Sequence, residues 1–186
     1  MIFTIGHSTR TFDEFVGLLK DHHVARIADI RTVPRSRRFP HFAREALAPA
    51  LAAVRIDYAH FPGLGGLRRP LRESVNTAWR NDSFRGYADY MGTPPFEQAM
   101  ADLLEFARGG ITAVMCAEAV WWRCHRRLLA DVLVARDMEV FHIVSRGSGG
   151  MHRLSPMARA VHGRVTYPGE AGENVQPGRR GARLNG

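Results

Sequence analysis

The densest group of chemically capable side chains lies in residues 115–126, MCAEAVWWRCHR. It contains both cysteines of the chain, Cys116 and Cys124, together with Glu118 and Arg126. A cysteine thiolate is a nucleophile, and the arginines and the helix start around Cys124 are expected to lower the pKa of its thiol. Glu118 or His125 could serve as the general acid or base. We therefore predict Cys116, Cys124 and Glu118 as catalytic candidates.

The same stretch is a poor match to a metal site. Its two cysteines and His125 offer at most three ligands, and the adjacent Cys124 and His125 are expected on different faces of the following helix. The loop between the cysteines also lacks the glycines of a persulfide-binding or phosphate-binding cradle. We therefore predict no metal, consider sulfur transfer less favoured, and leave the cofactor unknown.

A second candidate group lies in DIRTVPRSRR, residues 29–38. Asp29 precedes Arg31 by two positions at the end of an apolar run, so both side chains lie on the same face of a strand. An ion pair between them would orient Arg31 toward a ligand. Arg35 and Arg37 follow across a proline, and arginine suits bidentate contact with phosphate or carboxylate. A solvated basic loop is the alternative explanation of this run.

The segment GHSTRT, residues 6–11, leads into a predicted helix, whose first N–H groups attract anions. Ser8 and Thr9 would add donors there, although helix capping explains them equally well. No glycine-rich phosphate-binding motif is present in the sequence.

Two sets of site residues follow from these motifs. We predict Asp29 as a further catalytic residue, and the predicted anion-binding residues are Ser8, Thr9, Arg31, Arg35, Arg37 and Arg126.

These residues must be positioned by the alternating strands and helices of the chain. Apolar, β-rich runs predict strands at 1–6, 25–30, 56–61, 111–116 and 139–144. A capping box at Thr11 and Glu14 predicts one helix, and Thr93 with Pro94 begins another that ends at Gly109. Further helices are expected near 84–91, near 123–136 and at or around Pro49, where the helix starts or kinks.

This alternation predicts an α/β fold, a single three-layer domain with a mostly parallel sheet flanked by helices. The domain is expected to span residues 1–150, with a C-terminal extension over 151–186. Beyond about residue 163 the extension is rich in Gly, Pro and Arg, and we expect it to be largely irregular and flexible. In such sheets ligands bind at the carboxyl ends of the strands, where the candidate residues fall.

The charge balance points to an anionic partner, either a small molecule or nucleic acid. The formal net charge is +8, and Lys20 is the one lysine among 26 basic residues. A composition bias of the genome is an alternative reason for the excess of arginine over lysine. No apolar run approaches the ~20 residues of a membrane span, and the first residues do not resemble a signal peptide. We expect a cytoplasmic protein without a membrane partner, and the oligomeric state stays open.

The chain resembles the domain-of-unknown-function 488 family over roughly residues 1–145. The resemblance rests on IGHST (5–9), DIRTVPRSRRFPHF (29–42), YAHFPGLGG (58–66), GYADYM (86–91) and CAEAVWWRCHR (116–126). It implies a compact α/β domain whose marked polar positions are those described above. It implies no activity, because the family has no established general one. A weaker likeness to rhodanese-type domains concerns the fold alone.

Three functional hypotheses follow. The first is an enzyme that acts on a phosphate-bearing or nucleotide-bearing substrate, in which Arg31 and Arg35 hold the anion. The second is a nucleic-acid-binding module that uses the basic loops, with stacking surfaces at Trp121, Trp122 or Tyr87. The third is rhodanese-like thiol or sulfur-transfer chemistry at either cysteine. The enzyme hypothesis requires its site residues to converge on one pocket.

Overall fold

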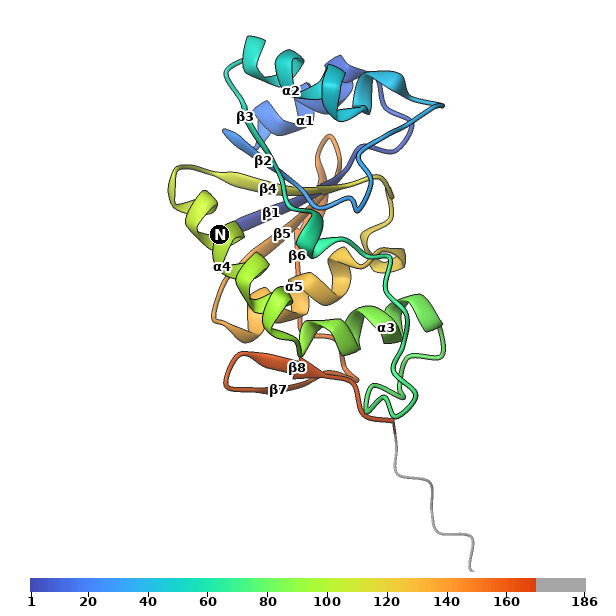
Figure 1. Cartoon of the computed structure of the whole chain (residues 1–186). Coiled ribbons are helices and arrows are strands. Elements are labelled where there is room, and N and C mark those ends of the chain that lie inside the picture. Colours follow the sequence, from blue (N-terminus) through green and yellow to red (C-terminus); the bar gives the residue numbers. More distant parts are fainter. Residues whose placement is uncertain (170–186) are drawn as a thin grey trace, which may run out of the picture.

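A six-stranded sheet forms the centre of the computed structural model, which describes residues 1–169 (Figure 1). Its strand order is β3-β2-β4-β1-β5-β6. The five parallel strands are β1 (Ile2–Gly6), β2 (Arg26–Asp29), β3 (Asp57–His60), β4 (Thr112–Cys116) and β5 (Val140–Ser145). The edge strand β6 (Ser148–Met151) pairs with β5 in the antiparallel direction. The predicted α/β class with a mostly parallel sheet is confirmed.

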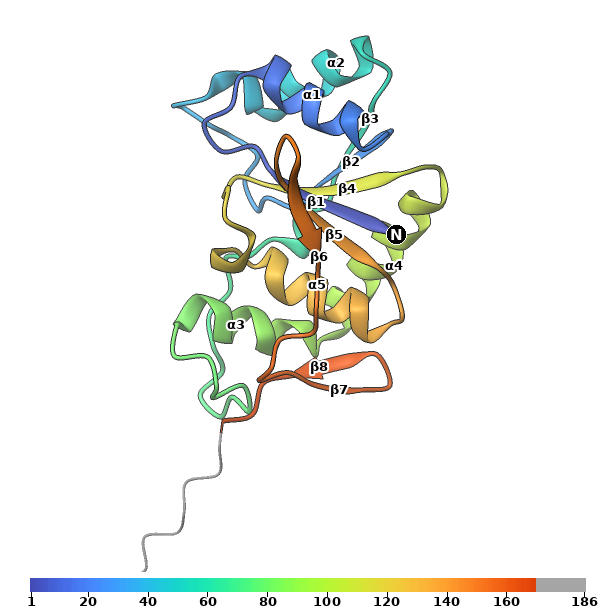
Figure 2. The ribbon, with the colours of Figure 1, turned by 180° about the vertical axis from the view of Figure 1, so that it is seen from behind.

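Helices cover both faces of this sheet. Helices α1 (Phe12–Asp21) and α2 (Arg44–Ala53) lie on one face, and the opposite face carries α3 (Asp82–Met91), α4 (Pro94–Arg108) and α5 (Arg126–Ala135) (Figures 1 and 2). Three short 3-10 turns occur at η1 (Pro40–Phe42), η2 (Pro62–Leu64) and η3 (Trp121–Arg123). None of the helices within residues 1–169 combines the length and apolarity needed to cross a membrane.

The helix boundaries follow local sequence signals. The Thr11 side chain accepts from the backbone N–H of Glu14, and the Glu14 carboxylate accepts from that of Thr11, which completes the predicted capping box. Pro94 occupies the first turn of α4, where its missing N–H costs nothing. Helix α2 already begins at Arg44, so Pro49 lies inside it rather than at its start.

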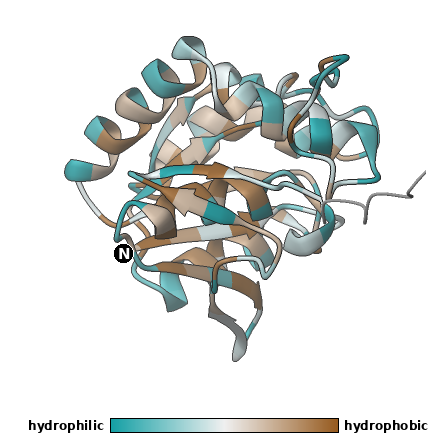
Figure 3. Ribbon diagram, turned by 90° about the horizontal axis from the view of Figure 1, so that it is seen from below, coloured by the Kyte–Doolittle hydropathy of each residue, from teal (hydrophilic) through white to brown (hydrophobic). Residues whose placement is uncertain are grey.

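The core divides into two layers, because successive strand residues point to opposite faces. On β4, Ala113 and Met115 pack in the cluster under α1 and α2, whereas Val114 and Cys116 belong to the cluster under α3, α4 and α5. Figure 3 shows mainly hydrophobic strands and helices in which hydrophilic and hydrophobic residues alternate. This alternation directs Cys116, the last residue of β4, toward the α5 side of the sheet.

The C-terminal extension packs on the domain as far as the structure describes it. Strands β7 (Arg159–Val161) and β8 (Arg164–Thr166) form a hairpin, and Tyr167 beyond it is fully buried. The Tyr167 hydroxyl donates to Asp131 of α5 at 2.8 Å, and the His152 ring bonds the same carboxylate at 2.9 Å. These contacts order residues 164–167, which differs from the irregular chain predicted beyond about residue 163. The rest of the predicted tail, 170–186, lies outside the described residues.

Candidate functional site

A pocket of about 810 Å³ lies at the carboxyl ends of β1, β2 and β4. Its walls come from the three segments that follow these strands and from the loops that precede α3. This is the place where open parallel sheets bind ligands, and the volume is within the usual range of small-molecule sites. The sequence predicts that the candidate residues gather at the strand ends, and the residues that line this pocket can be compared with that prediction.

The loop after β4 is held tightly across the end of β1. A methyl group on Gly6 would overlap the carbonyl oxygen of Glu118, so only glycine permits this crossing. The buried Arg126 guanidinium donates to the carbonyl oxygens of Glu118 and Ala119. The backbone N–H of Ser8 also donates to this loop, at 2.9 Å from the Ala117 oxygen. The loop is therefore a fixed wall of the pocket.

Both cysteines and His125 come together in this wall. The Sγ atoms of Cys116 and Cys124 and a ring nitrogen of His125 all lie within 4.8 Å of one another. Cys124 Sγ is 3.6 Å from His125 Nδ1. All three residues line the pocket. We expected Cys124 and His125 on different helix faces, but α5 begins only at Arg126, so both precede the helix and their side chains converge.

The pKa values of the two thiols shift in opposite directions. A hydrogen bond from the Cys116 thiol lowers the pKa of Cys124 well below its ordinary value, and His125 and Arg126 act in the same direction against the opposing effect of burial. The same hydrogen bond, together with burial, raises the pKa of Cys116 well above its ordinary value. Of the two thiols, Cys124 is therefore the one that loses its proton more readily.

The predicted Asp29–Arg31 ion pair is confirmed, and it is buried. Arg31 donates from Nε and Nη2 to the Asp29 carboxylate at 2.6–3.1 Å, and from Nη1 to the Phe42 carbonyl oxygen at 2.8 Å. Tyr58 donates a further hydrogen bond to Asp29 at 2.6 Å. Asp29 is fully buried and lies outside the pocket lining, whereas Arg31 lines the pocket and is 5% exposed. The guanidinium is thus largely engaged inside the protein.

A neutral histidine completes this network. Burial lowers the pKa of His7 to about 4. The ring stacks on Phe42 at 4.3 Å, with Nδ1 bonded to the Ser8 carbonyl oxygen and Nε2 3.3 Å from Arg31 Nη1. These partners assign the proton to Nδ1, so Nε2 accepts from Arg31. His7 also lines the pocket and was not among the predicted site residues.

The exposed arginines of the pocket are only partly those expected from the sequence. Arg35, Arg38 and Arg123 line the pocket, are exposed, and form no ion pair with any residue in the described range 1–169. Arg37 is exposed but lies outside the lining, and Arg126 is 1% exposed and holds the loop. The set of predicted anion-binding residues omitted Arg38 and Arg123, although each lies within a motif singled out in the sequence.

The remaining predicted residues all line the pocket. The pocket lining includes Ser8, Thr9, Cys116, Cys124 and the exposed Glu118.

The aromatic residues proposed as stacking surfaces differ in accessibility. Tyr87 is fully buried, and Trp121 stacks on His142 at 3.9 Å with an interplanar angle of 7°. Trp122 is 50% exposed. Of these three side chains, Trp122 is therefore the one that offers a free aromatic face to solvent.

Comparison with curated proteins and with solved structures finds no match. A protein-family model matches residues 11–133, which include both DIRTVPRSRR and CAEAVWWRCHR. This range covers well over half of the 186 residues and contains most of the pocket. The chain belongs to the family described as domain of unknown function DUF488.

Proposed function

We propose that this protein is an enzyme that acts on a small anionic substrate, bearing a phosphate group or a nucleotide, in the pocket at the strand ends. The observation that carries the proposal is the shared lining: the exposed Arg35, Arg38 and Arg123 line the same cavity as the Cys116–Cys124–His125 group. The arginines supply recognition, and the sulfur and imidazole group supplies reactive atoms.

The charges of the pocket favour an anion. The charge of Arg31 is balanced by Asp29, but three further guanidinium groups face one carboxylate, that of Glu118, among the described lining residues. Because these arginines have no described ion-pair partner, a phosphate does not have to displace one. A guanidinium presents two parallel N–H donors to phosphate oxygens, which gives geometric selectivity as well as affinity.

The position of the reactive group suits a substrate held by these arginines. Cys116 and Cys124 line the cavity and are 8% and 5% exposed, so their sulfur atoms are shielded from bulk water. Glu118 is exposed in the same lining and supplies a carboxylate for proton transfer. Electrostatic interactions with the substrate are strengthened by this partial exclusion of water.

Calorimetric titration with inorganic pyrophosphate and adenosine monophosphate tests the recognition step. We expect saturable binding to the wild type, and at least a tenfold weaker affinity, about 1.4 kcal/mol, in Arg35→Gln/Arg38→Gln. Arg37→Gln is the matched control, because Arg37 is exposed in the same loop but outside the pocket lining. Equal losses in the double variant and the control would contradict a pocket site.

The nucleic-acid alternative has one supporting observation, the half-exposed Trp122 beside Arg123. A nucleic-acid-binding module would use exposed arginines both inside and outside the pocket. Arg37→Gln would then weaken the binding of a fluorescent single-stranded oligonucleotide as much as Arg38→Gln does. The affinity for the oligonucleotide would also fall steeply as the salt concentration rises.

Sulfur transfer, the third hypothesis, requires a persulfide on one of the cysteines. Intact-protein mass spectrometry detects such a persulfide. The cytoplasmic location stays a prediction.

A further inference from the structure

We propose that Cys116, Cys124 and His125 bind a soft divalent metal ion, zinc in the first place, at the inner end of the pocket. Three protein donors leave one coordination position directed to the cavity. This inference names the reactive centre of the proposed function and depends on that function for its catalytic meaning. Metal binding itself depends only on the three residues.

The donor atoms have the spacing of a tetrahedral site. With zinc–sulfur bonds of about 2.3 Å and zinc–nitrogen bonds of about 2.0–2.1 Å, a tetrahedral angle separates sulfur from nitrogen by about 3.6 Å. The separation between Cys124 Sγ and His125 Nδ1 is 3.6 Å. Because all three donor atoms lie within 4.8 Å of one another, one ion reaches them with small side-chain rotations.

The ligand types select the class of metal. Thiolate and imidazole donors favour zinc and related soft or borderline ions over magnesium and calcium, which take oxygen ligands. Structural zinc sites use four protein ligands, whereas catalytic sites keep three and leave a position for water or substrate. The described group has three donors and lines a pocket, which is the catalytic arrangement.

The His125 ring gives an independent indication of a ligand. Its Nδ1 is 3.6 Å from the Cys124 sulfur and would hold the ion, whereas its buried Nε2 has no hydrogen-bond partner within residues 1–169. Buried polar atoms are rarely left without a partner, so a ligand that accepts a hydrogen bond from Nε2 would remove this unfavourable feature while Nδ1 faces the ion. The ring is otherwise fixed: it packs edge-on against Tyr87 at 5.1 Å, and Gly66 leaves room that a Cβ atom would occupy.

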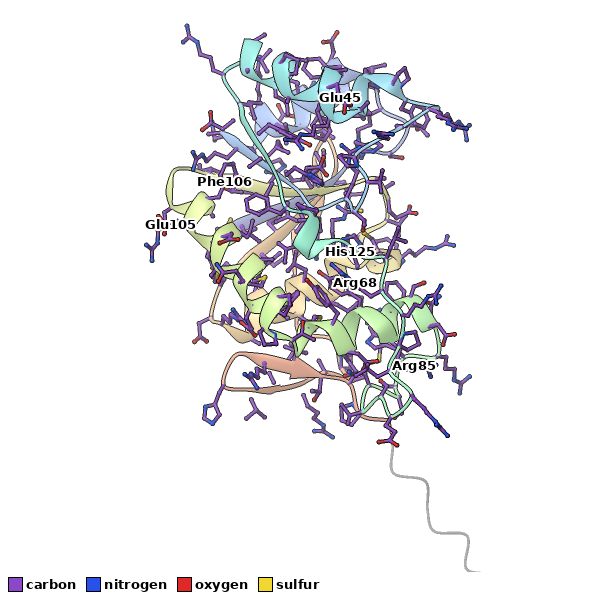
Figure 4. All side chains as sticks on the ribbon, viewed as in Figure 1. Glu45, Arg68, Arg85, Glu105, Phe106 and His125 are labelled. Carbon is purple, nitrogen blue, oxygen red and sulfur yellow. The ribbon has the colours of Figure 1, made fainter. Side chains whose placement is uncertain are left out.

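The surroundings hold the three ligands in place before any ion arrives. Cys116 is the last residue of the central strand β4, and Cys124 follows η3, where its backbone N–H donates to the Trp121 carbonyl oxygen. Figure 4 shows His125 at the start of α5, on the side where the loop after η2 passes. A zinc ion here would act as a Lewis acid on the anion that the arginines hold.

Cobalt titration of the chelator-treated full-length protein tests the site. Cobalt replaces zinc and reports its ligands, so we expect saturation at one ion per chain, a thiolate-to-cobalt charge-transfer band and the visible bands of tetrahedral cobalt. Cys116→Ser and His125→Gln should each weaken cobalt binding at least tenfold. The control His162→Asn changes an exposed histidine in the β7–β8 turn and should bind as the wild type does. Absence of the charge-transfer band, or equal binding by all variants, would overturn the proposal.

Thiol counting keeps the test decisive if a variant fails to fold. In native wild-type protein, zinc should block the reaction of both cysteines with a thiol reagent, and a chelator should restore it; no protection by zinc would sink the proposal. The pyrophosphate titration separates the two ideas. Pyrophosphate binding without cobalt binding would refute the metal site alone. Cobalt binding without pyrophosphate binding would refute the anion-binding function alone.

Discussion

Replacing Asp29 by Asn is expected to destabilise the protein strongly, because it removes the counter-charge of a buried arginine. Arg31 is 5% exposed and Asp29 is fully buried, and three contacts of 2.6–3.1 Å join them. Asparagine keeps the shape of the side chain but leaves the guanidinium charge without a carboxylate. Removing one partner of such a buried pair costs about 3–5 kcal/mol.

A second variant gives a smaller loss of stability with which the loss in Asp29→Asn can be compared. Tyr58→Phe removes one hydrogen bond of 2.6 Å to the same carboxylate and leaves the ion pair intact. Hydrogen bonds to charged groups contribute about 1.5–3 kcal/mol, and Asp29 keeps its other donors, so the lower part of this range is expected. The loss in Asp29→Asn should therefore exceed the loss in Tyr58→Phe by about 2 kcal/mol.

Urea denaturation followed by far-UV circular dichroism measures both losses as changes in the free energy of unfolding. Because single domains are stable by about 5–15 kcal/mol, the Asp29→Asn variant should unfold at a clearly lower urea concentration. A loss below about 1 kcal/mol in Asp29→Asn would refute the reasoning, since it would mean that the pair is solvated.

Three further predictions concern other parts of the fold. Burial lowers the pKa of His142 to about 3, so between that value and 6.5 the unfolded chain binds more protons than the native protein, and stability falls as the pH falls. We expect a loss of roughly 2 kcal/mol between pH 7 and pH 4.5 from this group, measured by urea unfolding at each pH; a His142→Gln variant with the same pH slope would contradict it. In Gly66→Ala, the new Cβ would meet the His125 ring at 2.5 Å, so cobalt affinity should fall while far-UV circular dichroism stays unchanged; unaltered affinity would show that the ring can move. In Arg126→Leu, the carbonyl oxygen of Glu118 loses its donor inside the protein. We expect thermal unfolding to show a loss of stability of about 1–3 kcal/mol. An unchanged stability would indicate that water replaces the guanidinium.

The elements and the Asp29–Arg31 pair were predictable because their signals are local. Asp29 is the last residue of β2 and Arg31 lies two positions further on, and the period of two of an extended chain places both side chains on the same face. The capping box of α1 and the first-turn proline of α4 likewise depend on residues within a single turn of helix. Short runs of apolar and β-rich residues predicted the parallel strands for the same reason.

The composition of the site was less predictable because it depends on irregular backbone. Arg37 and Arg38 are neighbours in the sequence, and only the path of the loop after β2 decides that Arg38 lines the pocket. The approach of Cys116 to Cys124 and His125 depends on a loop that crosses Gly6, a contact between distant segments.

The C-terminal hairpin shows the same limit. Tyr167 reads as an isolated aromatic residue in a polar segment, yet it packs in the core against Trp79 and donates a hydrogen bond to Asp131, 36 positions earlier. No local pattern carries that information. A polar segment with few apolar residues is normally a sign of irregular chain, and here a single buried contact site outweighs it.

We propose that the pocket at the strand ends receives an anion beside the cysteine and histidine group. A crystal structure of the protein grown with inorganic pyrophosphate would show where the anion binds. We predict pyrophosphate density inside the pocket, with oxygens at hydrogen-bond distance from the guanidinium groups of Arg35, Arg38 or Arg123. Pyrophosphate bound only to arginines outside the pocket, with the cavity empty of it, would contradict the account.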